Sequence, residues 1–157
     1  MMDVYVFGAE CAKGEEHDCA YRLLALALKQ VYGIDEMPTI EREKGGKPYF
    51  PQRKDICFNL SHSHGAAVCA VHHAPIGVDI ERLRPAPKRL ASGMDDLTFF
   101  RLWTAKEASV KREGKGIAAL LRDVTPDAPC QTEEEFMPGW IVTVCPSEKA
   151  EVRFVRI

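Results

Sequence analysis

Two acidic residues alternate with apolar ones near the middle of the chain, in the segment Ile76-Gly77-Val78-Asp79-Ile80-Glu81. If this segment is a β-strand, its side chains alternate between two faces. The apolar residues then enter the core, and Asp79 and Glu81 project from the opposite face about 7 Å apart. Two rigidly held carboxylates at that spacing suit a hard divalent cation such as Mg²⁺. The alternative is an exposed strand whose outward residues happen to be acidic.

A third acid follows in the segment Trp103-Thr104-Ala105-Lys106-Glu107-Ala108-Ser109-Val110-Lys111, where the apolar spacing predicts a helix. Glu107 and Lys111 are four residues apart and are therefore neighbours on its surface. One interpretation is an ordinary surface ion pair, which contributes only about 0.3–0.5 kcal/mol. The other is a metal site bridged to phosphates, in which Glu107 is a third carboxylate and lysines supply positive charge. The candidate lysines are Lys106, Lys111 and Lys115.

The histidines offer a second kind of chemistry. The segment Ser61-His62-Ser63-His64-Gly65 follows an apolar run, and its hydroxyls and imidazoles are suited to face a phosphate. A zinc cluster of His62, His64, His72 and His73 is the competing interpretation. His62 and His64 are two residues apart in a turn, whereas the zinc-binding histidines of the common hydrolase motif are four residues apart on a helix. The His72-His73 segment resembles a solvated loop. The sequence therefore disfavours zinc.

The elements that must position these residues are short and mixed. Residues 61–65 and 72–75 are expected to be turns, residues 82–96 a basic connector with a broken helical turn, and Gly33 a helix end. Expected strands are residues 3–7, 56–60, 66–71, 76–81, 140–145 and 151–156, and expected helices are residues 17–32 and 97–113. Strands and helices mixed at this spacing favour an α+β fold over a doubly wound sheet.

Composition excludes several classes of protein. The chain has 157 residues, 46% of them hydrophobic, which is ordinary for a globular domain. A formal charge of −2 argues against a generic nucleic-acid binder. Its apolar runs are far shorter than the roughly 18 residues of a membrane span, and no secretory leader is visible, so a cytoplasmic location is expected. The six cysteines show no Cys-x-x-Cys spacing, so free thiols are expected rather than a disulfide framework or structural zinc.

Four motifs occur in a specific order along the chain. They are Gly46-Lys47-Pro48, Phe58-Asn59-Leu60-Ser61-His62-Ser63, Gly77-Val78-Asp79-Ile80-Glu81 and the long segment from Trp103 to Gly116 that contains Trp-x-x-Lys-Glu. In this combination the chain resembles the 4′-phosphopantetheinyl transferase superfamily, in its larger type that acts on synthetase and synthase carrier domains. The resemblance covers roughly residues 18–124.

The resemblance implies an activity. Members transfer the phosphopantetheine arm of coenzyme A to a serine of an acyl or peptidyl carrier protein and release adenosine 3′,5′-bisphosphate. Asp79, Glu81 and Glu107 match the Mg²⁺-binding acids, Glu107 being also the expected proton acceptor, and Lys111 matches the lysine on the coenzyme A phosphates. Lys47, Ser61 and His62 match residues that hold the adenylate end.

The resemblance also implies an architecture and a partner. Two similar α/β halves related by a pseudo-twofold axis are expected at residues 1–75 and 76–157, as one monomeric unit with coenzyme A between them. A basic connector containing Arg82, Arg84, Lys88 and Arg89 would dock an acidic carrier protein; neither nucleic acid nor a membrane is expected as a partner. Only 21 residues separate Glu81 from Trp103, fewer than is usual for the family. Two rival interpretations are a coenzyme A-binding relative without catalysis and a zinc hydrolase.

Overall fold

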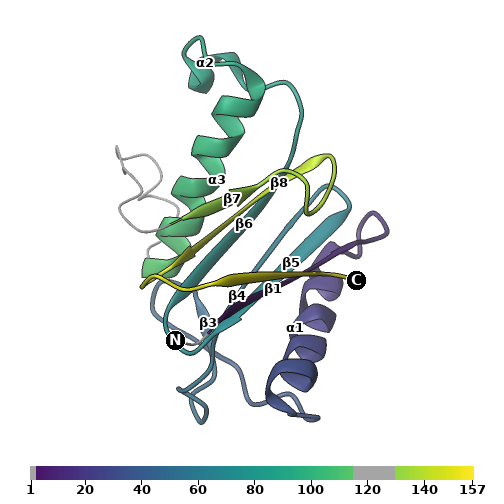
Figure 1. The fold of residues 1–157 in the computed structure, drawn as a ribbon, viewed down its shortest axis with the longest axis vertical. Coiled ribbons are helices and arrows are strands. Elements are labelled where there is room, and N and C mark those ends of the chain that lie inside the picture. Colours follow the sequence, from purple (N-terminus) through teal and green to yellow (C-terminus); the bar gives the residue numbers. More distant parts are fainter. Residues whose placement is uncertain (1–2, 115–129) are drawn as a thin grey trace.

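A computed structural model describes residues 3–114 and 130–157 as three helices and nine strands, seven of them in two main sheets and the other two in a small hairpin (Figure 1). The strands are β1 (Val4–Glu10), β2 (Glu41–Arg42), β3 (Pro48–Tyr49), β4 (Cys57–Ser63), β5 (Ala66–His72), β6 (Ile76–Arg82), β7 (Gln131–Glu133), β8 (Trp140–Pro146) and β9 (Val152–Arg156). The helices are α1 (Glu16–Tyr32), α2 (Lys88–Ala91) and α3 (Asp96–Glu113). The expected α+β class is confirmed.

The two main sheets have related connectivity. The first has the strand order β4-β5-β1-β9, and the second has the order β6-β8-β7. In the first sheet, β1 is followed by α1 and later by β4 and β5, and β5 pairs antiparallel with β1. In the second sheet, β6 is followed by α3 and then by β7 and β8, and β8 pairs antiparallel with β6. Helix α1 packs on the first sheet and α3 on β6 and β8. Strand β9 returns to the first sheet, where it pairs parallel to β1.

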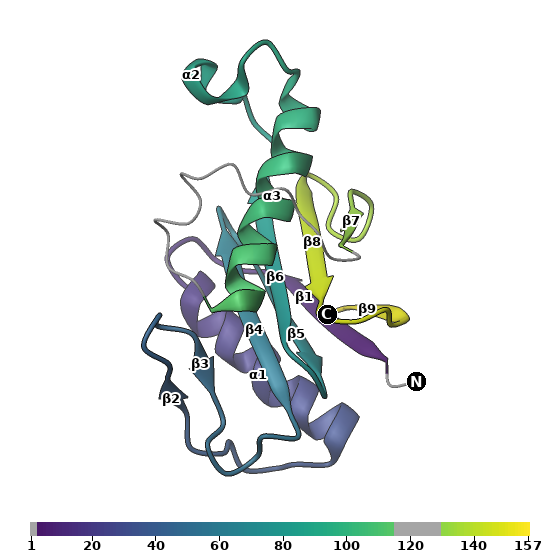
Figure 2. The same cartoon turned by 90° about the vertical axis from the view of Figure 1, so that its left-hand side faces the viewer.

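Both long helices end where the sequence predicts. Gly33 follows α1 and Gly114 follows α3, each in the left-handed conformation, with φ of 68° and 72°. Glycine adopts this conformation without the steric cost that a Cβ atom adds. Asp95 begins α3 by accepting a hydrogen bond from the backbone N–H of Thr98 at 2.7 Å. Figure 2 shows α2 beyond the end of the sheets. Among these described helices, none combines the length and apolar character of a membrane span.

Strands β4 and β6 lie side by side and join the two sheets through side chains. Asn59 Oδ1 accepts a hydrogen bond from the N–H of Val78 at 2.8 Å, and Ser61 Oγ accepts one from Ile80 at 3.2 Å. Ser63 Oγ accepts a third from the N–H of Arg82, at 3.3 Å. Side chains of every second residue of β4 therefore accept the backbone N–H hydrogen bonds of β6 that the carbonyl groups of a paired strand would otherwise accept.

The expected turn at residues 61–65 is wrong in its extent. Strand β4 continues through Ser63, and the turn to β5 consists of His64 and Gly65, which have φ of 43° and 90°. Positive φ at both central residues matches the right-handed twist of a two-residue hairpin. The composition of this segment favours a turn, whereas the pairing of Ser61 and Ser63 with β5 makes them strand residues.

The face of β6 that carries the acids is covered by α3. Ile76, Val78 and Ile80 are buried in the apolar core between the sheets, as the alternation predicts. On the other face, a Cβ atom at Gly77 would lie 1.9 Å from the carbonyl oxygen of Ala108. The helix can approach this closely only because residue 77 has no side chain. The interpretation of the acids as an exposed strand face is therefore wrong.

The expectation of six free thiols is also wrong. Cys130 and Cys145 form a disulfide. They are 15 residues apart, but β7 and β8 pair antiparallel with Gln131 opposite Val144, so the hairpin places the two cysteines opposite each other. The remaining cysteines are free thiols, as expected: Cys11, Cys19, Cys57 and Cys69.

Candidate functional site

Three carboxylates from two distant segments meet where α3 packs on β6. Asp79 and Glu81 come from the strand and Glu107 from the helix, and one oxygen of each lies within 4.8 Å of the others. The alternation along β6 puts its two acids on one face, and the close approach at Gly77 brings the helix over that face. Oxygen ligands at this spacing are what Mg²⁺ or Ca²⁺ requires.

Asp79 is the buried member of this acid cluster, with 3% of its surface exposed. Its Oδ1 accepts a hydrogen bond from Ser61 Oγ at 3.0 Å, while its Oδ2 has no hydrogen-bond partner in the described parts of the chain. Burial raises the pKa of Asp79 well above its usual value, and the neighbouring Glu107 and Glu81 raise it further, against the opposing effect of Lys111. A buried carboxylate oxygen without a partner is costly unless a cation occupies the site. The acid cluster therefore fits a divalent cation.

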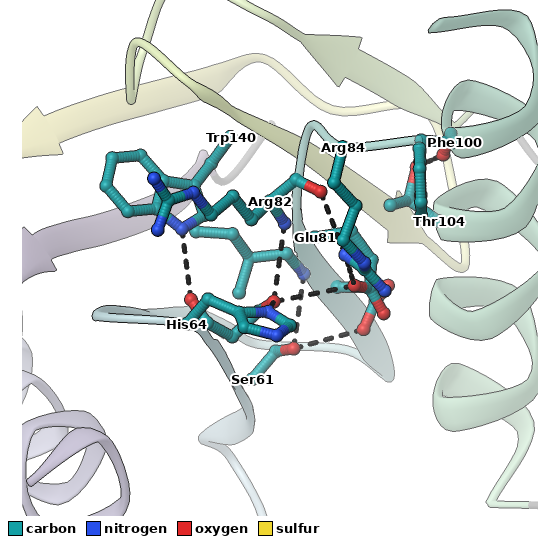
Figure 3. A network of polar contacts seen from close by, with 11 residues as sticks. Ser61, His64, Glu81, Arg82, Arg84, Phe100, Thr104 and Trp140 are labelled. Atoms are coloured by element: carbon teal, nitrogen blue, oxygen red, sulfur yellow. Dashed lines mark hydrogen bonds and ion pairs between the residues drawn. The ribbon is translucent and has the colours of Figure 1, made fainter. Parts of the chain in front are cut away.

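Glu81 is held in place by its own partners (Figure 3). Its Oε2 accepts hydrogen bonds from Arg84 Nη1 at 3.0 Å and from Ser63 Oγ at 3.4 Å. Arg84 also donates to the carbonyl of Arg82 at 2.8 Å, and its guanidinium lies 4.7 Å from the centre of the Phe100 ring. One residue of the expected docking connector thus positions a candidate metal ligand.

Lys111 places a positive charge at the junction of the two sheets. Its ammonium donates to the carbonyls of Leu60 on β4 and Val78 on β6, both at 2.7 Å. Burial lowers the pKa of Lys111, and the carboxylates of Asp79, Glu107 and Glu81 oppose that shift. An ammonium has three N–H donors, so one remains for a ligand as far as the described residues are concerned.

A cavity of about 310 Å³ lies beside the acid cluster, lined by α1, the β2–β3 hairpin, β4 and the end of α3. Lys111 reaches it from one side, and Arg42 and Lys47 reach it from the hairpin. His17 and His62 add two imidazoles, and none of the described residues that line the cavity is acidic. A cavity with this charge suits an anionic ligand.

The other predicted site residues do not all lie at the cavity. Lys47 is part of the cavity, where its ammonium donates to the carbonyls of Ile76 at 3.2 Å and Arg112 at 2.9 Å. Burial lowers its pKa. His62 lines the cavity, whereas the Ser61 hydroxyl turns to Asp79. Lys106 lies on α3 but is not among the residues that line the cavity, and Lys115 lies outside the described residues.

The sequence gives four contributors another role or none: Asn59 is only part of a motif, Ser63 is expected to face a phosphate, Arg84 is expected to dock a carrier, and Arg42 has no expected role. Asn59 and Ser63 were visible as polar residues alternating with Leu60 and His62, a period of two that indicates one face of a strand. Arg84 and Arg42 carry no such signal, because Arg84 lies in the connector after β6 and Arg42 in the two-residue strand β2, and only the folded chain brings them to the site.

Replacing Asn59 with alanine tests the junction between the sheets. The substitution leaves the buried N–H of Val78 without its acceptor, so the free energy of unfolding should fall by about 1–3 kcal/mol. Urea denaturation measures this loss. Gln30→Ala, which removes an exposed amide from α1, should leave stability nearly unchanged. Equal stability of the two variants would show that the Asn59 bond does not join the sheets.

An acid cluster beside a cationic cavity is characteristic of proteins that act on phosphorylated ligands, and comparison with known proteins agrees. No family model matches the chain. A 4′-phosphopantetheinyl transferase of Bacillus subtilis is 36% identical over 116 residues, 63% of this chain and 52% of the relative. Psf-1 of Bacillus pumilus, also named a 4′-phosphopantetheinyl transferase, is 30% identical over 86% of this chain and 72% of its own length. The 4′-phosphopantetheinyl transferase Sfp of Bacillus subtilis strain 168 is 31% identical over 78% of this chain and 70% of its own length.

The chain therefore belongs to the 4′-phosphopantetheinyl transferase family, as its motifs indicate. It spans about half the length of the first of these relatives and about seven tenths of the other two. The rival interpretation as a zinc hydrolase is not favoured, because the relatives are all named as transferases of one kind.

Proposed function

We propose that the protein transfers the 4′-phosphopantetheine arm of coenzyme A to a serine hydroxyl of an acyl or peptidyl carrier protein. The observation that carries this proposal is the convergence of Asp79, Glu81 and Glu107 beside Lys111 and the cationic cavity. The names of the relatives support the same reaction. Membership of this family implies that coenzyme A is the substrate. The positive charge of the cavity suits the phosphates of coenzyme A.

Asp79, Glu81 and Glu107 are the proposed ligands of Mg²⁺. When bound there, the ion would neutralise charge on the diphosphate of coenzyme A. Lys111, with two of its N–H groups fixed by Leu60 and Val78, would direct the third toward the same phosphates. The adenylate end of coenzyme A would be held by Lys47, Arg42 and His62. Ser61 would act indirectly, by donating a hydrogen bond that orients Asp79.

The chemical step requires alignment and one proton transfer. The carrier serine oxygen bonds to the phosphorus that carries the pantetheine arm, and the bond from that phosphorus to the bridging oxygen breaks. Adenosine 3′,5′-bisphosphate leaves with the bridging oxygen, and the proposed acceptor of the serine proton is Glu107. Phosphoryl transfer depends mainly on positioning and charge stabilisation, which this set of residues is suited to provide.

We also propose that the chain consists of two halves, residues 1–75 and 76–157, related by a pseudo-twofold axis. The shared connectivity of the two sheets supports this division, with β9 crossing back as an added strand. The acidic carrier would dock on the basic connector, where Lys88 and Arg89 are exposed and Arg84 is engaged with Glu81. A cytoplasmic monomer remains a prediction from the sequence.

Mass spectrometry of a carrier protein tests the proposed reaction. Apo-carrier incubated with the protein, coenzyme A and Mg²⁺ should gain the mass of one phosphopantetheine arm at its serine. Omitting Mg²⁺ and adding a chelator should prevent the gain. If several carriers gain no mass while coenzyme A still raises the melting temperature, the protein is a coenzyme A-binding relative without catalysis.

A further inference from the structure

A second group of metal-binding side chains lies away from the acid cluster. His72 ends β5, His73 follows it in a bend, and Glu148 comes after β8, with one ligand atom of each within 4.8 Å of the others. Glu148 Oε1 is 2.8 Å from His73 Nε2 and 3.9 Å from His72 Nε2. His72 pairs with Cys57 at one end of the β4–β5 hairpin, whereas Glu81 lies beside Ser63 at the other. The two groups of side chains are therefore separate.

His72 is prepared as a metal ligand by its surroundings. Its side chain is fully buried, and its Nδ1 lies 3.1 Å from the backbone carbonyl of Asp3. A carbonyl only accepts hydrogen bonds, so Nδ1 carries the proton and the lone pair of the neutral ring is on Nε2.

The Nε2 atom of His72 has no hydrogen-bond partner within residues 3–114 and 130–157. A buried nitrogen of this kind calls for an explanation, because polar atoms in protein interiors are nearly always paired. A histidine held through one ring nitrogen by a backbone carbonyl, with the other nitrogen free, is the arrangement found around protein-bound metals. His73 and Glu148 complete the group from the side exposed to solvent.

We propose that His72, His73 and Glu148 bind a divalent transition-metal ion, with zinc as the ion that best suits two imidazoles and one carboxylate. The sequence disfavours zinc because His62 and His64 lack the helical spacing of zinc hydrolases and because His72-His73 resembles a solvated loop. The structure buries His72 and brings Glu148 to it, while His62 and His64 are not part of the group. This site is independent of the proposed arm transfer.

The bound ion would link the two sheets and stabilise their packing. Residues 72 and 73 lie where the first sheet passes into the second, and Glu148 follows the last long strand of the second sheet. The same two segments are already joined by a hydrogen bond from the N–H of Ser147 to the carbonyl of Pro75, at 3.1 Å. A ligand that binds only this folded arrangement stabilises it.

Zinc binding to the full-length protein tests the proposal. Protein stripped with a chelator is dialysed against Zn²⁺ in excess Mg²⁺, which occupies the acid cluster, and bound zinc is measured by elemental analysis. We expect one zinc per chain and, at a hundredfold excess over the dissociation constant, a rise in melting temperature of about 5–10 °C. His73→Ala and Glu148→Gln alter exposed side chains and should each weaken binding at least about tenfold.

Two matched variants separate this site from other sources of zinc binding. His17→Ala removes an exposed histidine that also lies near a carboxylate, 3.7 Å from Asp18, and should retain zinc. Glu107→Gln alters the acid cluster and should retain zinc as well. The proposal is overturned if the parent binds no zinc, if His73→Ala binds as tightly as the parent, or if Glu107→Gln abolishes binding. None of these readouts depends on arm transfer, so failure here leaves the proposed function standing.

Discussion

Glu107→Gln should lower the rate of the proposed arm transfer by about 10²–10³-fold, the expected effect of removing one charged group that stabilises a phosphoryl-transfer site. The side chain keeps its size and loses its negative charge, so the acid cluster loses a metal ligand and the proposed acceptor of the serine proton. Stability should change little, because the loss of the Glu107 charge removes its repulsion of buried Asp79 and also its attraction to buried Lys111. The carrier mass assay measures the rate, and thermal unfolding measures stability.

The matched control is Glu36→Gln, which removes a negative charge from an exposed residue far along the chain from the acid cluster. This variant should transfer the arm at the parental rate. Parental activity in Glu107→Gln would mean that the acid cluster is not the reacting centre. Loss of folding together with activity is excluded by the unfolding measurement.

Lys111→Met should cause the largest loss of stability, about 3 kcal/mol, because it removes one partner of a buried charge pair. The ammonium is the countercharge of Asp79, and its loss also leaves the carbonyls of Leu60 and Val78 without their donor. For a chain of this length the melting temperature should fall by about 6–12 °C. Affinity for coenzyme A should fall as well, since the phosphates lose a positive charge.

Lys106→Met is the stability control on the same helix. It makes the same substitution five residues earlier, at a half-buried side chain that does not line the cavity, and it should change the melting temperature little. A double variant sharpens the test: Asp79→Asn with Lys111→Met should be less destabilising than the sum of the single variants, because no unpaired charge remains. Additive losses would show that Lys111 and Asp79 do not act as a pair.

Much of the fold could be predicted from local patterns. Alternation located β6 with Ile76, Val78 and Ile80 inward, and helical spacing with a following glycine located α1 and α3 to within a residue at each end. Composition misled at Ser61 and Ser63, because serines are frequent in turns and their strand role depends on pairing with β5. The disulfide was missed for a similar reason, since only the register of β7 on β8 places Cys130 opposite Cys145.

The sequence by itself determined the family, through the order of four motifs, and it singled out Asp79, Glu81, Glu107 and Lys111. Residue type and spacing within one strand or one helix are local properties, so they can be interpreted before the chain is folded. Only the tertiary structure decided that α3 lies directly on the acid-bearing face of β6, that Arg84 holds Glu81, and that Lys111 spans both sheets. It alone brought Glu148 to His72 and His73. Except for the contact of Arg84 with Glu81, three residues away, these contacts join residues far apart in the chain, and their geometry depends on how two sheets and a helix pack.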